Sequence, residues 1–149
     1  MSVGKFCNRE VVIVETTATI IETAQIMRHH HVGDLVVVDQ RSGKPEPIGI
    51  VTDRDIVISV IAAQVDMVSL TVGDLMSGEL ITAKEDDGLW DTLQRMRGGG
   101  MRRLPVVDAA RALVGIITVD DILELLAEEM GDLVRIIKQE QVKERGLKA

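Results

Sequence analysis

The chain contains one sequence unit twice, and this repeat constrains the fold more than any other feature. Residues 3–39 align with residues 72–108 without a gap, and eleven of the paired positions are identical. After a loop that is three residues longer in the first copy, GIVTDRD (residues 49–55) aligns with GIITVDD (residues 115–121). Each copy is therefore one structural unit, and the two units are expected to share one fold.

Both copies have the same predicted order of elements. A short apolar run comes first, and an amphipathic helix with apolar residues at helical spacing follows. Two strands come next, at residues 35–39 and 48–52 in the first copy and at 104–108 and 114–118 in the second. These strands are apolar throughout, which is typical of strands buried on both faces. A second helix ends each copy, so the pattern predicts a β-α-β-β-α unit.

A unit of about 60 residues buries too little surface to be stable alone. We therefore expect an α+β fold in which two units pack strand face to strand face in pseudo-two-fold symmetry, followed by a C-terminal helix. The expected boundaries are residues 3–66 for the first unit, 70–130 for the second and 131–149 for the helical tail.

The tail continues the last helix and contains an apolar seam. Leu126, Met130, Leu133 and Ile137 follow a 4-3-4 spacing, which places them on one side of a helix. Such a seam requires a partner, either the body of the protein or another subunit, and we expect a homodimer. Gly131 lies within the seam and is expected to break or bend the helix.

The composition argues against several classes of protein. The net charge of −7 is opposite to the basic stripe of a nucleic-acid binder, and no Tyr and only one Phe and one Trp offer stacking surfaces. No apolar run approaches the ~20 residues that span a membrane, so we expect no membrane insertion. Cys7 is the only cysteine, which excludes an internal disulfide and suits a reducing cytosol. We therefore predict a cytoplasmic protein.

The repeated Thr-x-x-Asp stretch has two interpretations. Thr52 with Asp55, and Thr118 with Asp121, fit capping boxes at the start of a helix. The same residues fit a nucleoside phosphate site, because a carboxylate binds vicinal ribose hydroxyls, and a Thr hydroxyl and a helix end suit a phosphate. The two roles do not exclude each other, so both stay open.

The chain resembles a known family at these residues. The duplicated unit, the strand RRLPVVD, the paired GIVTDRD and GIITVDD endings and the stretch VGDLMSGELITA are similar to a tandem pair of CBS domains, a Bateman module. The resemblance covers residues 3–130. It implies a regulatory module that binds AMP, ADP or ATP, or S-adenosylmethionine, in clefts between two repeats. It also implies dimerisation and control of a partner protein in trans, whose identity the sequence does not reveal.

The resemblance also implies roles for particular residues. Asp55 and Asp121 are expected to hold ribose hydroxyls, with Thr52 and Thr118 near phosphate. The adenine is expected among aliphatic side chains, with Val11, Val12 and Val32 at one site and Leu80, Ile81 and Met101 at the other.

The two copies differ where a phosphate is expected. The second copy has Arg102 and Arg103, whereas the matching residues of the first are Gly33 and Asp34. Arginine binds phosphate through its charge and its planar fork, and an aspartate repels it. We therefore expect the site with Asp121 to bind an anionic nucleotide more tightly than the site with Asp55. Alternatively, the arginines pair with acidic side chains of the protein.

Other functions find less support in the sequence. The run HHH at residues 29–31 suggests a metal site, but adjacent helical positions point in different directions and no completing ligand stands at a suitable spacing. We expect no metal, no catalytic residue and no cofactor beyond the regulatory nucleotide, because no catalytic motif is found. A scaffold that dimerises without a ligand remains an alternative.

Overall fold

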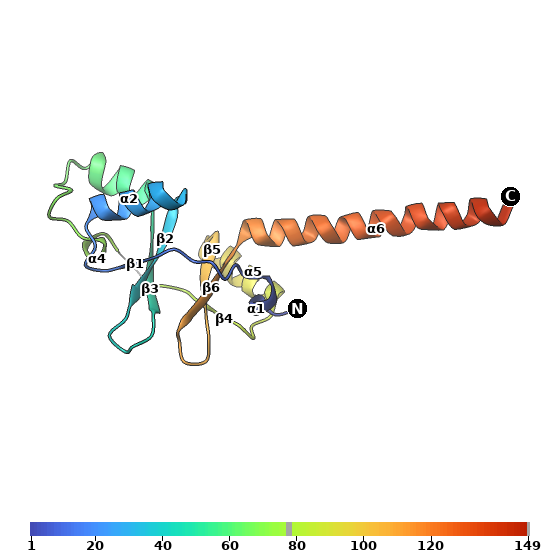
Figure 1. Cartoon of the computed structure of the whole chain (residues 1–149), viewed down its shortest axis with the longest axis horizontal. Helices are drawn as coiled ribbons and strands as arrows, with labels where there is room; N and C mark the ends of the chain where they lie inside the picture. Colours follow the sequence, from blue (N-terminus) through green and yellow to red (C-terminus); the bar gives the residue numbers. More distant parts are fainter. Residues whose placement is uncertain (77–78, 149) are drawn as a thin grey trace.

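The computed structural model describes residues 1–76 and 79–148. It has an α+β fold with thirteen helices, helical turns and strands in these residues, as the two-repeat pattern predicts (Figure 1). In chain order they are α1 Val3–Phe6, β1 Ile13–Glu15, α2 Ile20–His30, β2 Asp34–Asp39, β3 Glu46–Thr52, α3 Asp53–Ile56, the π-helical turn η1 Val57–Ile61, α4 Val72–Leu75, β4 Ala83–Lys84, α5 Leu89–Gly99, β5 Arg103–Val107, β6 Leu113–Thr118 and α6 Val119–Lys148.

Each repeat forms its own three-stranded sheet. The strand orders are β1-β2-β3 and β4-β5-β6, and in each sheet the first pair is parallel and the second antiparallel. The register shifts at matching positions, between Val37 and Val38 in one sheet and between Val106 and Val107 in the other. The apolar residues of the central strands are buried, because helices cover one face of each sheet and the other sheet covers the opposite face.

A small apolar cluster joins the two sheets. Val36 and Val38 of β2 pack against Ile116 of β6, and Ile13 and Leu113 lie at the edge of this cluster. The backbone N–H of Leu113 also donates to the carbonyl of Pro45, at 2.8 Å. The units therefore meet strand face to strand face, as expected, and the two hairpins β2-β3 and β5-β6 run side by side (Figure 1).

Each repeat receives its first helix from the segment that precedes the other repeat. Val3 of α1 is fully buried in the core of the second repeat, and its N–H donates to the carbonyl of Asp87 at 2.9 Å. Val72 of α4 is buried in the core of the first repeat, with its N–H 2.9 Å from the carbonyl oxygen of Ala18. The cores are therefore interlocked, although the sequence order places residues 3–6 with the first unit.

Two glycines permit this exchange. A Cβ atom added to Gly115 would lie 2.7 Å from Sγ of Cys7 and 2.8 Å from the backbone oxygen of Asn8. A Cβ atom added to Gly49 would contact the side chain of Met76. In both copies a Gly precedes the Thr of the capping box by three residues. This Gly marks the place where the exchanged segment crosses a strand of the other repeat.

The last helix is long and continuous. α6 begins at Val119 and runs through Gly131 to Lys148, so the expected break at Gly131 is wrong. Ile122 and Leu125 anchor its first turns in the core of the second repeat. Its remaining length projects away from the body as a single helix (Figure 1). No described helix combines the length and hydropathy that a membrane span requires.

Candidate functional site

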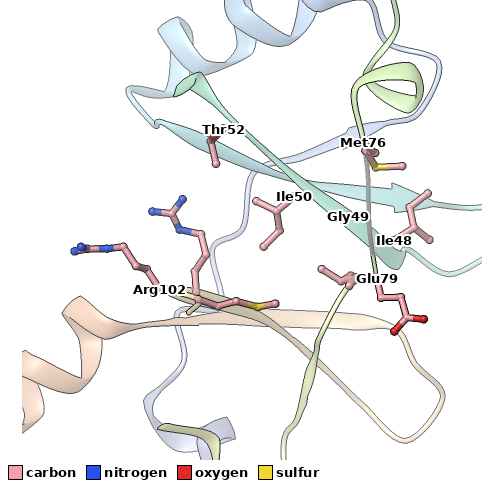
Figure 2. Close-up of a pocket in the computed structure, with 10 residues that line it drawn as sticks. Ile48, Gly49, Ile50, Thr52, Met76, Glu79 and Arg102 are labelled. Atoms are coloured by element: carbon pink, nitrogen blue, oxygen red, sulfur yellow. The ribbon is translucent and has the colours of Figure 1, made fainter. Parts of the chain in front are cut away.

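A cavity of about 460 Å³ lies between the two repeats. Strand β3 of the first repeat forms one wall, and the segments before β4 and β5 of the second repeat form the other (Figure 2). The residues that line it are Ile48, Gly49, Ile50, Thr52, Met76, Glu79, Leu80, Met101, Arg102 and Arg103. A volume of this size is typical of small-molecule sites, which enclose an apolar group and orient it with a few polar groups.

The polar groups lie at opposite ends of the cavity. Thr52 and Arg102 mark one end, and Glu79 lies at the other, with Ile50 between them (Figure 2). Arg103 directly follows Arg102 and also lines the cavity. The cavity therefore offers an apolar middle and a cationic end, which suits a flat apolar group that carries an anion.

Within residues 1–76 and 79–148, the ion pairs of both arginines are long. Nη1 of Arg103 lies 3.4 Å from Oδ2 of Asp34, and the Nε of Arg103 is buried without a hydrogen-bond partner among the described residues. Nη2 of Arg102 lies 3.9 Å from Oδ1 of Asp120, and three-quarters of the Arg102 side chain is exposed. These guanidinium groups retain donors for an anion, although the expected alternative, pairing with acids of the protein, also holds in part.

The capping box of the first repeat is formed. The N–H of Thr52 donates to Oδ2 of Asp55 at 2.9 Å, and the N–H of Asp55 donates to Oγ1 of Thr52 at 3.1 Å. The N–H of Asp53 donates to the carbonyl of Gly33, and that of Arg54 donates to Oδ1 of Asp53. These four N–H groups are therefore occupied, and the short helix α3 offers no free end to a phosphate. The hydroxyl proton of Thr52 remains a donor.

The second capping box repeats this geometry. The N–H of Thr118 lies 2.9 Å from Oδ2 of Asp121, and the N–H of Asp121 lies 3.1 Å from Oγ1 of Thr118. All four residues thus cap helices, which is one of the two interpretations of the motif. Any ligand contact of these four residues has to be made while they also cap their helices.

The family follows from comparison with known proteins. The sequence model of the CBS domain family matches residues 3–61 and 72–128, which make up most of the chain. The chain belongs to the CBS domain family. Its two CBS repeats correspond to the two units seen in the structure, and CBS pairs are regulatory modules that bind nucleotide-like ligands.

Individual relatives extend this finding. CBS domain-containing protein YhcV of Bacillus subtilis is 33% identical over 143 residues, which are 95% of this chain and 98% of YhcV. Protein MK0525 of Methanopyrus kandleri is 39% identical over 125 residues, which are 84% of this chain but only 62% of that relative. The CBS pair of MJ0100, solved with 5-methylthioadenosine and S-adenosyl-L-methionine, is 27% identical with a TM-score of 0.73, covering 87% of this chain and 98% of the other.

The cavity combines residues of the two CBS repeats in an unexpected way. Arg102, Arg103, Met101 and Leu80 of the second repeat face Thr52 of the first repeat, not Thr118. In this cavity the arginines therefore lie with Thr52, whereas the sequence analysis grouped them with the Asp121 site. The physical reason is that the two sheets pack face to face, which places the start of β5 in the second repeat beside β2 and β3 of the first.

Asp55 lies beside this cavity rather than in it. It lines an adjoining cavity of about 280 Å³ together with Ser59 and Leu75. Ile50 and Met76 line both cavities and form the wall between them. Asp55 is therefore not among the residues that line the 460 Å³ cavity, although it lies close to it.

The remaining predicted residues pack against the cores of the two repeats. Val12 and Val32 contact the core of the first repeat, Ile81 contacts the core of the second, and Val11 contacts the cluster between the sheets. Neither they nor Thr118 and Asp121 line the 460 Å³ cavity. The positions that correspond to Arg102 and Arg103 are Gly33 and Asp34, and Gly33 lies next to the carboxylate of Asp53. That side of the pair is therefore acidic.

Several lining residues escaped the sequence analysis. Ile48, Gly49 and Ile50 were taken as strand residues only, and Met76 and Glu79 were given no role. The repeat alignment offered one clue, because Met76 occupies the position of Cys7. In the structure Cys7 lies over Gly115 and Met76 lies over Gly49, each a glycine of the other repeat.

The histidine run and the cysteine have structural surroundings. His29 and His30 contact each other edge to face at the end of α2, and His31 adopts a left-handed conformation that ends this helix. No group of three or more potential ligands able to hold a metal occurs within residues 1–76 and 79–148. Burial raises the pKa of the Cys7 thiol, and the nearby Arg9 only partly opposes this effect.

Proposed function

We propose that this CBS pair is a regulatory module that binds an adenine nucleotide, AMP, ADP or ATP, and controls a partner protein in trans. The observation that carries the proposal is the 460 Å³ cavity between the repeats, with two arginines at one end. An adenine ring fits its apolar middle and a phosphate fits its cationic end. The proposed role is binding without turnover, by a protein of the cytoplasm.

Each part of the nucleotide has a candidate contact. The adenine packs against Ile50, Leu80 and Met101, because aliphatic side chains can enclose a flat ring without aromatic stacking. The phosphate accepts from the guanidinium groups of Arg102 and Arg103 and from the Thr52 hydroxyl. Hydrogen bonds between charged groups contribute about 1.5–3 kcal/mol each, which makes the arginines the strongest contributors to affinity.

The ribose is the part that requires a movement. Its hydroxyls point toward the wall formed by Met76, behind which Asp55 lies. Methionine has three rotatable bonds and repacks at low cost, so a ligand can join the two cavities. Asp55 then binds the ribose with Oδ1, while Oδ2 keeps its bond to the Thr52 N–H.

The same surroundings favour one nucleotide per chain. At the symmetry-related position, Gly33 and Asp34 stand where Arg102 and Arg103 support the first site, and the carboxylate of Asp53 lies next to Gly33. A phosphate there meets negative charge. We therefore propose that Asp121 serves as a helix cap only, whereas Asp55 both caps and binds.

S-adenosylmethionine is the second candidate ligand, because MJ0100 was solved with that compound. It has no phosphate, and its sulfonium carries a positive charge. The two arginines therefore favour a nucleotide over S-adenosylmethionine in this chain. A scaffold without a ligand is the third possibility that an experiment has to separate.

Titration calorimetry with AMP, ADP, ATP and S-adenosylmethionine tests the proposal. We expect one nucleotide per chain and a roughly ten- to hundredfold weaker affinity in Arg103→Met, from the loss of one charged hydrogen bond. Asp55→Asn should also weaken binding, whereas Asp121→Asn alters an equivalent cap and should leave the affinity unchanged. The two variants form a matched pair, since both lose the same capping carboxylate.

The outcomes separate the alternatives. If S-adenosylmethionine binds more tightly than any nucleotide, the proposed ligand is wrong and S-adenosylmethionine takes its place. Two equal sites per chain, or equal losses in Asp55→Asn and Asp121→Asn, contradict the asymmetric site. No heat and no thermal shift with any of the four compounds favours the scaffold, because a ligand at a hundred times its Kd stabilises by about 2.7 kcal/mol.

A further inference from the structure

One face of α6 is apolar and exposed beyond the point where the helix leaves the body. Leu126 is 40% exposed, Met130 67%, Leu133 62% and Ile137 57%. At 3.6 residues per turn these side chains fall within one narrow arc of the helix. We call the face the α6 stripe, and its members are Leu123, Leu126, Ala127, Met130, Leu133, Val134 and Ile137.

The stripe faces away from the body of its own chain. Ile122 and Leu125 are the residues of α6 that are buried in the core of the second repeat. From Leu126 onward every large apolar side chain of α6 is at least 40% exposed. The body therefore does not cover the stripe, and the helix projects from it as a single rod (Figure 1).

The charges along α6 are divided between its halves. Residues 119–134 contain six acidic residues and no basic one. Residues 135–147 contain four basic and two acidic residues. A helix with this distribution is complementary to a copy of itself in the opposite orientation, and it repels a copy in the same orientation along the acidic half.

We propose that the α6 stripe pairs with the α6 stripe of a second copy of this chain, in antiparallel orientation. In the register that best matches the apolar layers, Leu126 of one copy lies opposite Ile137 of the other. Met130 then lies opposite Leu133, which gives four apolar layers around a two-fold axis near residues 131 and 132. The helix dipoles of the two copies also oppose each other favourably.

The same register brings opposite charges level with each other. Glu128 lies level with Arg135 of the other copy, and Asp120 lies level with Lys143. At 3.6 residues per turn Glu128 and Arg135 point away from the stripe, so the attraction acts between the charged halves as a whole and not through an ion pair at the contact. The basic C-terminal half of each helix therefore lies alongside the acidic first turns of the other. A two-fold interface of this kind is isologous, so it closes at the dimer. The pairing does not depend on the proposed nucleotide site, because the stripe and the cavity share no residue.

Two matched substitutions in the full chain test the contact. Ile137 lies in the stripe and is 57% exposed, whereas Val142 is 59% exposed and lies about 140° around the helix from Ile137. Ile137→Asp and Val142→Asp carry the same charge change and the same cost in helix propensity. In sedimentation equilibrium, we expect Ile137→Asp to raise the dissociation constant at least tenfold and Val142→Asp to leave it near the wild-type value.

The orientation is tested by a distance between spin labels. A label at Gly146→Cys, in a chain with Cys7→Ser, lies about 44 Å along the axis from its counterpart in the antiparallel dimer, at 1.5 Å per residue. A parallel pair would place the labels less than about 20 Å apart. Added salt should weaken the antiparallel dimer, since it screens the attraction between the halves. A monomeric wild type, equal effects of the two substitutions, or a short label distance refutes the proposal.

Discussion

The two crossing glycines give a stability prediction that depends on the segment exchange. Gly115 and Gly49 occupy the same position in the two CBS repeats, and each lies under a segment that comes from the other side of the pair. Replacing either with alanine adds one methyl group at an equivalent place. The structure nevertheless predicts unequal results, because the atoms above the two glycines differ.

At Gly115 the new Cβ meets atoms that cannot move freely. The backbone oxygen of Asn8 would lie at 2.8 Å, and that oxygen accepts from the N–H of Ile116 at 2.9 Å. The N–H of Asn8 donates in return to the carbonyl of Ile116. Displacing the segment therefore strains both hydrogen bonds, and we expect Gly115→Ala to destabilise the protein by about 1–3 kcal/mol, the usual cost of overpacking.

At Gly49 the neighbour is a flexible side chain. The atoms that a new Cβ would meet all belong to the Met76 side chain, which can change rotamer. We expect Gly49→Ala to cost less than about 1 kcal/mol. Because Gly49 and Met76 both line the cavity, this variant should lose ligand affinity although it keeps its stability.

Urea denaturation followed by circular dichroism measures both variants. For a domain of this size each kcal/mol corresponds to about 2–4 °C in Tm, so thermal scans give an independent check. Gly131→Ala serves as a contrasting control, because a Cβ there has no neighbour within 4 Å and the exchange removes a helical glycine, so this variant should gain up to about 1 kcal/mol. If Gly115→Ala is as stable as the wild type, or if Gly49→Ala loses more than Gly115→Ala, the reasoning about the crossing segments is wrong.

Three further predictions concern single groups. Thr52→Val and Thr118→Val should each cost about 1 kcal/mol in unfolding experiments through a lost cap, but calorimetry should show weaker nucleotide binding only for Thr52→Val. The Thr71 N–H and hydroxyl lower the pKa of Asp74, and carboxyl NMR titration should show a midpoint below 3.8. The contribution of Asp74 to stability is therefore present above the unfolded pKa and is lost as pH falls through the folded pKa. Burial raises the pKa of Cys7, so the folded protein should react more slowly with a thiol reagent at pH 8 than the unfolded chain, and Arg9→Gln should slow it further.

The sequence was sufficient to predict the repeat architecture. Eleven identities at one fixed shift, together with apolar strands and the two Thr-x-x-Asp starts, predicted two equal units, and the structure confirms them. The capping interpretation also held at atomic detail, because capping depends on residues three positions apart. Local patterns of this kind report local hydrogen bonds well.

The grouping of the site residues was beyond the sequence analysis. Thr52 and Arg103 line the same cavity because the two sheets pack face to face, and this contact joins residues far apart in the chain. A repeat alignment instead pairs Arg103 with Asp34, and the structure shows these two residues as partners in an ion pair across the repeats. Equivalent positions in a two-fold arrangement can face each other, which an alignment does not reveal.

Helix lengths were also predicted unevenly. A second helix was expected at the end of each copy, but in the first repeat α3 ends at Ile56 and a π-helical turn follows to Ile61. The corresponding helix of the second repeat instead continues for 30 residues. Gly131 does not interrupt it, since a single glycine in a helix costs only about 1 kcal/mol and Glu129, Met130 and Leu133 nearby are good helix formers.

Arg102 connects the cavity between the repeats with the start of α6. Its carbonyl accepts from the N–H of Val119, the first residue of α6, at 2.9 Å, and its guanidinium lies 3.9 Å from Asp120 of the first turn. The same guanidinium lines the cavity between the repeats. An anion that binds there competes with Asp120 for Arg102, so a bound ligand changes the electrostatic surroundings of the point where α6 begins. A regulatory module requires a physical link of this kind, because occupancy of an internal cavity controls a partner only if it alters a surface that the partner can contact.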